Sequence, residues 1–177
     1  MTLGDAAAMS GLRYVALRYF NVAGADPKGR LGQSTPKASH LIRLAAQTAL
    51  GLRPYLEIFG TDYPTTDGSC IRDYIHVHDL GPAHLAALEH LRGGGSSQNL
   101  NCGYGHGYSV LDVIASVERV SGRRIATSLA PRRTGDPSAV VADATNLRNL
   151  LAWKPQLNDL DRIVGDTLAW ERRLAVL

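Results

Sequence analysis

Leu17-Arg18-Tyr19-Phe20-Asn21-Val22-Ala23-Gly24-Ala25 is the stretch that most strongly indicates how this chain folds. Residues 14–20 are mostly apolar or aromatic and follow Gly11, which predicts a short buried strand. Residues 26–37 are rich in glycine, proline and polar side chains, which predicts a loop. The stretch therefore predicts a strand that runs into a long loop.

Strands and helices alternate through the rest of the sequence. Short apolar runs predict further strands at 56–59, 71–77, 98–102 and 125–129. Apolar positions at helical spacing predict helices at 41–52, 79–92, 109–121, 143–151 and 160–168. This alternation favours an α/β fold, with the strands at 14–20 and 71–77 in one layer and the residues after 105 in another.

Two of the helices carry specific predictions about their starts. Asp79 is expected to cap its helix, with Pro82 in the first turn. The same helix is expected to turn three leucines inward: Leu85, Leu88 and Leu91. Ser109 and Asp112, three residues apart, resemble a capping box at the start of the next helix.

Composition and charge place the chain among ordinary globular proteins. It has 177 residues, 45% hydrophobic and 20% charged, and its net charge of +3 does not require a nucleic-acid partner. Cys70 and Cys102 show no metal-ligand spacing, so a reduced, cytoplasmic protein is expected. No apolar run approaches the ~20 residues of a membrane span, and residues 1–8 lack the features of a signal peptide, so no membrane partner is expected.

Several motifs of common enzyme chemistry are missing from the sequence. In residues 103–107 (GYGHG) the third glycine of a dinucleotide-binding turn would fall on Tyr108, which predicts a plain strand-to-helix turn. No tyrosine is followed four residues later by lysine, the spacing that would lower a phenol's pKa on one helical face. His76 and His78 would share a strand face, but no third metal ligand is evident. There is no G-x-S-x-G nucleophile motif.

A set of arginines would suit a ligand that carries phosphate. Arg72 follows a turn-rich loop, and Arg132 and Arg133 lie in another such segment. Separated guanidiniums can clamp a diphosphate, and Asp136 could accept from a ribose hydroxyl. The sequence leaves two alternatives open, namely solvent-exposed arginines and a structural Arg–Asp ion pair.

Five segments occur in an order that resembles the extended short-chain dehydrogenases/reductases: residues 17–25, 58–69, 72–77, 109–113 and 131–136. The run from Ile58 to Val77 is most similar to UDP-galactose (UDP-glucose) 4-epimerases. The resemblance extends from about residue 12 to residue 170.

The resemblance implies roles for residues near the opening stretch. Tyr19 and Phe20 would lie against the nicotinamide end of NAD. Asn21 would hydrogen-bond the diphosphate or the sugar of the substrate. His40 and Leu41 would lie at a helix start and offer backbone N–H groups to the diphosphate.

The resemblance also implies how the nucleotide of a UDP-sugar is held. Glu57, Ile58 and Phe59 would flank the uracil, with the strand backbone reading its edge. Arg72 and Arg133 would clamp the diphosphate.

Two further positions would contact the sugars. Asp136 would hold the uridine ribose. Val140 occupies a position where a bulky tyrosine restricts family members to unmodified hexoses, so the smaller valine predicts that N-acetylated sugars are admitted.

The implied function is UDP-hexose 4-epimerase, which interconverts UDP-glucose and UDP-galactose through a 4-keto intermediate with bound NAD. The implied fold is a partial Rossmann-like parallel sheet with a small α/β substrate-binding domain. Residues 12–25 and 70–103 would form the Rossmann-like layer, and residues 26–69 and 104–177 the substrate-binding part. The N-terminal NAD-binding half is expected to be missing, so the chain alone is expected to be inactive and marginally stable.

Other interpretations stay open. The chain could be a non-catalytic UDP-sugar-binding module, or a subunit that completes a separately encoded NAD-binding half. A nucleotide-sugar dehydratase is a further alternative within the same resemblance. Full-length relatives are commonly homodimers, with the contacting helices largely outside this chain.

Overall fold

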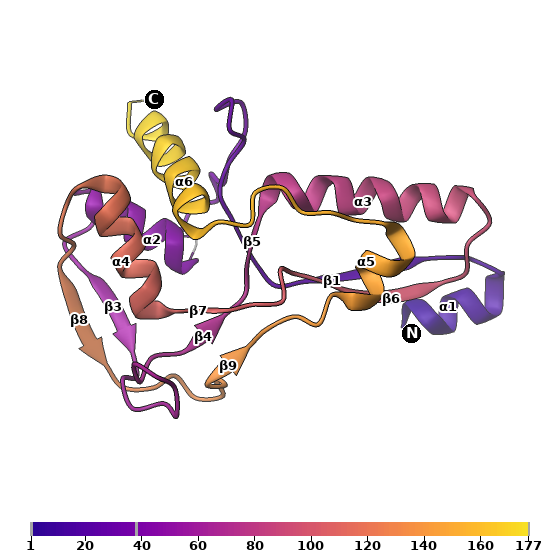
Figure 1. Ribbon diagram of the computed structural model, residues 1–177, viewed down its shortest axis with the longest axis horizontal. Helices are drawn as coiled ribbons and strands as arrows, with labels where there is room; N and C mark the ends of the chain where they lie inside the picture. Colours follow the sequence, from indigo (N-terminus) through magenta and orange to yellow (C-terminus); the bar gives the residue numbers. More distant parts are fainter. Residues whose placement is uncertain (1, 38, 177) are drawn as a thin grey trace.

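The computed structural model describes residues 2–37 and 39–176 and confirms an α/β fold (Figure 1). Its helices are α1 (Leu3–Ser10), α2 (Leu41–Ala49), α3 (Val77–Arg92), α4 (Val110–Ser121), α5 (Thr145–Leu151) and α6 (Leu160–Leu174). Its strands are β1 (Val15–Tyr19), β2 (Asn21–Ala23), β3 (Leu56–Phe59), β4 (Ile71–Arg72), β5 (Tyr74–His76), β6 (Gln98–Cys102), β7 (Tyr108–Ser109), β8 (Thr127–Ala130) and β9 (Ala139–Val140).

The strands form small, mostly parallel groups. β1 pairs with β6, with Val15 opposite Gln98 and Tyr19 opposite Cys102. β2 pairs with β5 and β3 with β8, also in parallel, and β4 lies between antiparallel β7 and parallel β9. The β1–β6 pair, with α3 packed against β1, is the partial Rossmann-like layer that the sequence predicted.

Figure 1 shows an elongated molecule with two ends. At the sheet end β1 and β6 lie between α3 on one side and α1 on the other. The helical end holds α2, α4 and α6 beside the β3–β8 pair. The division into a Rossmann-like and a substrate-binding part stays a prediction, and α5, assigned to the latter, packs against β6 and α3 at the sheet end.

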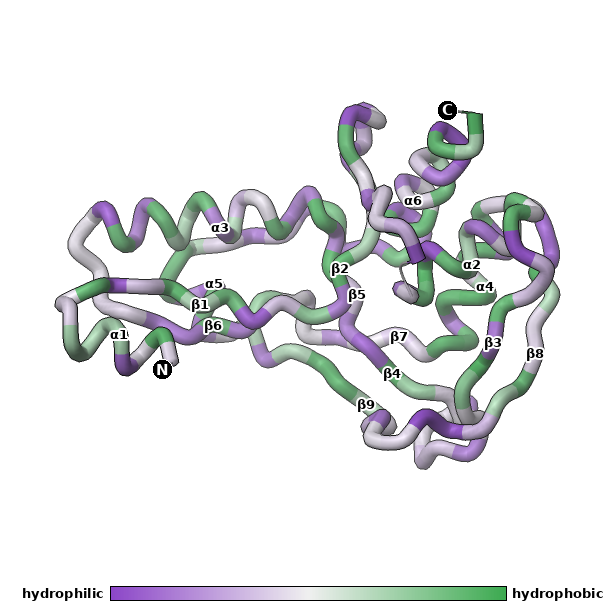
Figure 2. The backbone as a smooth tube through the Cα atoms, turned by 180° about the vertical axis from the view of Figure 1, so that it is seen from behind, coloured by the Kyte–Doolittle hydropathy of each residue, from purple (hydrophilic) through white to green (hydrophobic). Residues whose placement is uncertain are grey.

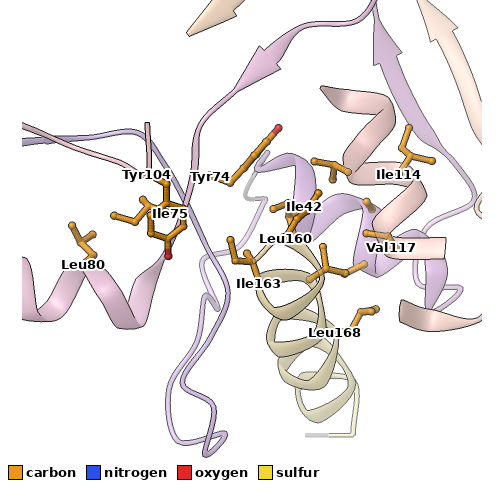
Figure 3. Close-up of a cluster of buried hydrophobic side chains, with 14 of the residues drawn as sticks. Ile42, Tyr74, Ile75, Leu80, Tyr104, Ile114, Val117, Leu160, Ile163 and Leu168 are labelled. Atoms are coloured by element: carbon orange, nitrogen blue, oxygen red, sulfur yellow. The ribbon is translucent and has the colours of Figure 1, made fainter. Parts of the chain in front are cut away.

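A continuous apolar core connects the two ends (Figure 3). Ile75 and Leu80 lie with Tyr104 on one side, and Ile42 and Ile163 lie on the other. The helical end is closed because the apolar faces of α2, α4 and α6 all meet one another. Burial of these faces from water is the main source of its stability.

The capping box at α4 is confirmed. The Ser109 side chain accepts from the N–H of Asp112, and the Asp112 side chain accepts from the N–H of Ser109. Gly122 ends the helix in a left-handed conformation, with φ of 68°. This helix was predictable because all of its determinants are local.

The predicted cap at Asp79 is wrong. α3 begins two residues earlier, with His76 as its N-cap, so Asp79 lies inside the first turn and Pro82 beyond it. The Asp79 carboxylate is buried and accepts from the hydroxyl of Tyr104 and from the backbone N–H groups of Gln156 and Leu157. It therefore anchors the segment after α5 instead of its own helix.

The predicted inward face of α3 is wrong at two of its three leucines, whereas Leu91 is half-buried. Leu85 and Leu88 are 56% and 45% exposed, whereas Ala83 and Ala87 are buried. The small alanines allow α3 to approach β1 closely, and this turns the leucines outward. The sequence pattern alone does not distinguish these two apolar faces.

The predicted strand at 71–77 is broken at Asp73. β4 pairs with β7 and β9, and β5 pairs with β2. The backbone N–H of Asp73 donates to Val140, and its carbonyl accepts from Asn21, so the chain changes partners at this residue. Because of the break, β4 and β5 on either side of Asp73 pair with different strands, β4 with β7 and β9 and β5 with β2.

Apolar residues are exposed at the sheet end. In Figure 2 hydrophobic positions recur along α1 and α3, at the end of the molecule farthest from α2. Leu3 and Met9 on α1 are 48% and 83% exposed. Within residues 2–37 and 39–176, no helix is both long and apolar enough to cross a membrane.

Candidate functional site

A pocket of about 270 Å³ opens where the two ends of the molecule meet. The β2–β5 pair, the start of α2, β3 and the segment after β8 all contribute side chains. Most of the residues predicted to bind substrate line it: Asn21, His40, Leu41, Glu57, Phe59, Arg72, Arg133 and Asp136. The fold therefore brings together residues that are far apart in sequence.

One carboxylate links the two predicted arginines. Asp136 Oδ2 accepts from Arg133 Nε at 2.8 Å, and Asp136 Oδ1 lies 3.7 Å from Arg72 Nη2. Arg72 is mostly enclosed, because only 15% of its side chain is exposed. The Arg–Asp ion pair left open by the sequence is thus present, and it holds two guanidiniums at one pocket, where they can bind phosphate oxygens.

Arg133 also covers an aromatic wall of the pocket. Its guanidinium carbon lies 4.9 Å from the ring centroid of Phe59, at the end of β3. A cation over an aromatic face is a favourable contact that a flat, uncharged ring system could replace. The same side chain therefore contacts an anion partner and an aromatic surface.

The neighbouring Arg132 points elsewhere. Its Nε donates to Asp62 Oδ1 at 2.7 Å, and its guanidinium lies over the ring of Tyr63. The hydrogen bond from Arg132 holds the pKa of the Asp62 carboxyl below its usual value. Arg132 therefore anchors the loop after β3 and does not line the pocket.

The start of α2 faces the pocket. His40 is the N-cap residue, and its side chain does not cap the helix but lies with Nδ1 2.8 Å from Gln33 Nε2. The first N–H groups of a helix have no partner within the helix and carry a partial positive charge. Leu41 and Ile42 line the pocket at this position, which is suited to an anion.

Asn21 is held by hydrogen bonds to Asp73, the residue between β4 and β5. Both its backbone N–H and its side-chain amide donate to the carbonyl of Asp73. The Asp73 carboxylate is fully buried and accepts from the N–H groups of Tyr104, Gly105 and Ala142. Asp73 therefore holds one wall of the pocket, a role that the sequence did not reveal.

The glycine-rich turn at residues 103–107 wraps around this carboxylate. A Cβ on Gly103 would lie 2.7 Å from Asp73 Oδ2 and 2.6 Å from the Cβ of Ala142. The turn needs glycine for close packing, and it donates two of its N–H groups to Asp73. It joins β6 to the short strand β7, which leads into α4, so it is a strand-to-strand turn and not the strand-to-helix turn that the sequence predicted.

A second, open depression of about 470 Å³ adjoins the pocket and shares Asn21 and Arg72 with it. Tyr19, Phe20 and Val140, the remaining positions predicted near the cofactor and the sugar, line this depression. Tyr19 is 53% exposed at the end of β1. Asn21 and Arg72 therefore contribute to both hollows.

Ile58 differs from the other predicted residues. Its side chain is 4% exposed and belongs to the core, and it does not line the pocket. Its neighbours Glu57 and Phe59 line the pocket, as alternation along a strand requires.

Tyr74 and Cys70 also line the pocket but were missed from the sequence. Both are mostly buried, and burial raises the pKa of the Tyr74 phenol, so this tyrosine is neutral at physiological pH. In sequence both resemble ordinary core residues next to a strand. Only the break at Asp73 shows that they face a cavity.

His76 takes part in internal hydrogen bonds. Its Nδ1 accepts from the N–H of His78, so Nε2 carries the proton and donates to Asp166 at 3.1 Å. Burial lowers the pKa of His76 and favours this neutral form. Among residues 2–37 and 39–176, no group of three or more His, Cys, Asp or Glu side chains could hold a metal ion.

A family model described as the NAD dependent epimerase/dehydratase family matches residues 2–103. The UDP-glucose 4-epimerase of Azospirillum brasilense is 58% identical over 172 residues, which are 97% of this chain and 49% of that protein. The chain thus spans about half the length of the curated relatives it matches.

Solved structures agree with this similarity. A UDP-glucose 4-epimerase from Stenotrophomonas maltophila, with bound NAD and formylated UDP-arabinopyranose, superposes with a TM-score of 0.92 at 41% identity, over 98% of this chain and 52% of that one. The UDP-Glc/GlcNAc 4-epimerase of Campylobacter jejuni gives 0.79 at 49% identity, over 97% and 52%. From its sequence and its fold, this chain belongs to the NAD dependent epimerase/dehydratase family.

Proposed function

We propose that this chain is the UDP-sugar-binding part of a UDP-glucose 4-epimerase. The observation that carries the proposal is the pocket in which Arg72 and Arg133, joined by Asp136, face the start of α2. Two guanidiniums and a helix N-terminus together suit a diphosphate. The relatives named above, which are epimerases of about twice this length, support the assignment.

In this proposal Arg133 changes partners when the nucleotide binds. The uracil stacks on Phe59, where the guanidinium of Arg133 now lies. Arg133 then moves to the diphosphate, and Asp136 is released to accept from the uridine ribose. Arg133 thus exchanges a carboxylate for phosphate oxygens, and Asp136 exchanges a guanidinium donor for a hydroxyl donor while keeping Arg72 nearby.

Of the NAD molecule, the described residues of this chain would contact only the nicotinamide end. Tyr19 and Phe20 line the open depression and would meet the nicotinamide ring. The turn at 103–107 donates N–H groups to Asp73, and this use makes it unsuited to a pyrophosphate. When bound, NAD supplies hydride transfer, while this chain's own residues hold the nucleotide and leave the sugar free to turn.

Val140 supports a second part of the proposal, that the sugar site admits N-acetylated hexoses. Valine is small, and the depression that it lines is open. The Campylobacter jejuni relative is named for both UDP-Glc and UDP-GlcNAc. If the joined protein described below converts UDP-galactose but not UDP-N-acetylgalactosamine, this part is wrong.

The test joins this chain to the first half of the Azospirillum brasilense relative, at the position where the two sequences begin to match. We expect this joined protein to interconvert UDP-glucose and UDP-galactose, and the 177-residue chain alone to show no turnover, because no tyrosine in it has a lysine four residues later. Binding of UDP is measured by calorimetry on the joined protein.

Arg72→Ala and Arg132→Ala form a matched pair for the same test. Arg72→Ala should weaken UDP binding by about tenfold or more, because it removes a charged hydrogen-bond donor from the pocket. Arg132→Ala, at a residue that does not line the pocket, should leave the affinity nearly unchanged. Equal effects of the two variants, or no UDP binding by the joined protein, would contradict the proposal.

A further inference from the structure

Side chains on one face of α6 form hydrogen bonds to the segments that line the pocket. The residues of α6 do not line the pocket themselves. Asp166, Thr167, Trp170 and Glu171 follow the spacing that places side chains on one side of a helix. Each of them bonds to a different segment of the chain. In Figure 1 α6 stands between the loop that follows β2 and the helices α2 and α4.

The first two residues hold the β2–β5 pair. Asp166 Oδ2 lies 3.1 Å from Nε2 of His76, the last residue of β5. Thr167 Oγ1 accepts from the N–H of Gly24 at 3.1 Å, directly after β2. These contacts fix the ends of the two strands that carry Asn21 and Tyr74.

Trp170 holds the loop that leads into α2. Its Nε1 donates to the carbonyl of Gln33 at 3.0 Å. The Gln33 side chain in turn contacts His40, the residue before α2. Trp170 therefore acts on the helix start through one intervening residue.

Glu171 holds α2 itself. Its two carboxylate oxygens accept from Arg43 Nε and Gln47 Nε2, each at 2.8 Å. Only 3% of the Glu171 side chain and 11% of the Arg43 side chain are exposed. Arg43 also donates to the carbonyl of Thr35, so this buried pair joins α6, α2 and the loop before α2.

Two glycines make these close approaches possible. A Cβ on Gly24 would lie 2.5 Å from Nε2 of His76. A Cβ on Gly32 would overlap the ring of Trp170. A side chain at Gly32 would push its loop away from α6, and one at Gly24 would push the loop after β2 away from His76, which Asp166 of α6 holds.

We infer that α6 is a brace that sets the distance between the start of α2 and the β2–β5 pair, and that Glu171 and Trp170 are positioning residues for the diphosphate. The inference rests on the proposed UDP-sugar site. The brace acts through placement, since the four residues of α6 lie outside the lining of the pocket. A break in it should therefore weaken UDP binding without removing any group that touches the ligand.

The test compares Glu171→Gln with Asp161→Asn in the joined protein. Asp161 is also on α6 and makes an ion pair, but its partner Arg119 is on α4, away from the pocket. We expect Glu171→Gln to raise the Kd for UDP about tenfold, the size of coupling typical of packed networks, and Asp161→Asn to leave it unchanged. The double variant Arg43→Gln/Glu171→Gln should recover part of the loss, because it removes the unpaired buried charge.

Trp170→Phe removes the N–H donated to Gln33 and keeps a smaller aromatic ring at the same position. We expect it to raise the Kd for UDP about threefold with a small change in Tm. If Asp161→Asn weakens binding as much as Glu171→Gln, or if Glu171→Gln and Trp170→Phe leave the affinity unchanged, the brace is wrong. If Arg72→Ala still weakens UDP binding by about tenfold or more in that case, the proposed function stands without the brace.

Discussion

The helical end and the sheet end of this molecule differ in how completely their apolar surfaces are covered. At the helical end Val113, Val117 and Ile163 are fully buried between α2, α4 and α6. At the sheet end Tyr19 and Leu85 are 53% and 56% exposed. Each end has apolar faces, but only the helical end covers them with elements of the described chain.

The edges of the strands show the same contrast. Among the described residues, β1 pairs in parallel with β6 alone, so its other edge has no strand beside it. Parallel sheets in α/β proteins are normally covered on both faces and flanked on both edges. The predicted nucleotide contacts gather near the covered end, and the predicted nicotinamide contacts lie at the uncovered one.

The largest expected effect comes from truncating the core of the helical end. Ile163→Ala removes a side chain with 0% exposure and should lower the free energy of unfolding by about 2–5 kcal/mol, through lost burial and a residual cavity. Leu88→Ala at the sheet end, at a residue 45% exposed, should change it by less than about 0.5 kcal/mol. Both are measured by urea unfolding of the 177-residue chain. Similar losses for the two variants would show that α3 is covered in solution and would break the comparison.

The sequence predicted the fold best where local residues determine it. The α4 capping box and the strands at 56–59 and 98–102 depend on neighbours in sequence, and they were correct. The break at Asp73 was missed because its cause lies in carbonyl and N–H partners at positions 21 and 140. The two-residue strands β7 and β9 were missed because such short strands have no pattern of their own.

A glycine at the junction between the ends gives the second prediction. Gly24→Ala combines a φ of 80° with a Cβ that would overlap the His76 ring, so we expect a loss of about 2–3 kcal/mol. Gly122→Ala is the matched control, because its φ is 68° but nothing lies within 4 Å of the new Cβ, and it should cost only about 1–2 kcal/mol. Equal losses by urea unfolding would show that the contact between Gly24 and the His76 ring at the end of β5 is loose.

The candidate site was predicted through its charged residues more than through its supports. Arg72, Arg133 and Asp136 have few structural uses near a turn, so sequence reasoning finds them, and the fold brings them together. The face of α6 that braces the site was interpreted only as a final helix. Its bonds to Gly24 and Gln33 span more than a hundred residues, and no local pattern records them.

The smallest expected effect is a pH dependence at the same junction. Burial lowers the pKa of His76 in the folded state, whereas in the unfolded chain it titrates near about 6.5. Asp166 on α6 and Asp79 on α3 partly oppose this shift, while His78 adds to it. As the pH falls through about 6.5 the unfolded chain gains a proton that the native ring does not, so the free energy of unfolding decreases.

His76→Asn provides the reference for this pH dependence. The Asn carbonyl can still accept from the N–H of His78, but the side chain does not titrate. The difference in unfolding free energy between the two proteins should therefore change between about pH 7 and pH 5, with the native protein losing more stability on acidification. Parallel pH profiles would mean that His76 stays able to take a proton in the folded state, and that the junction between the two ends is open to water rather than packed.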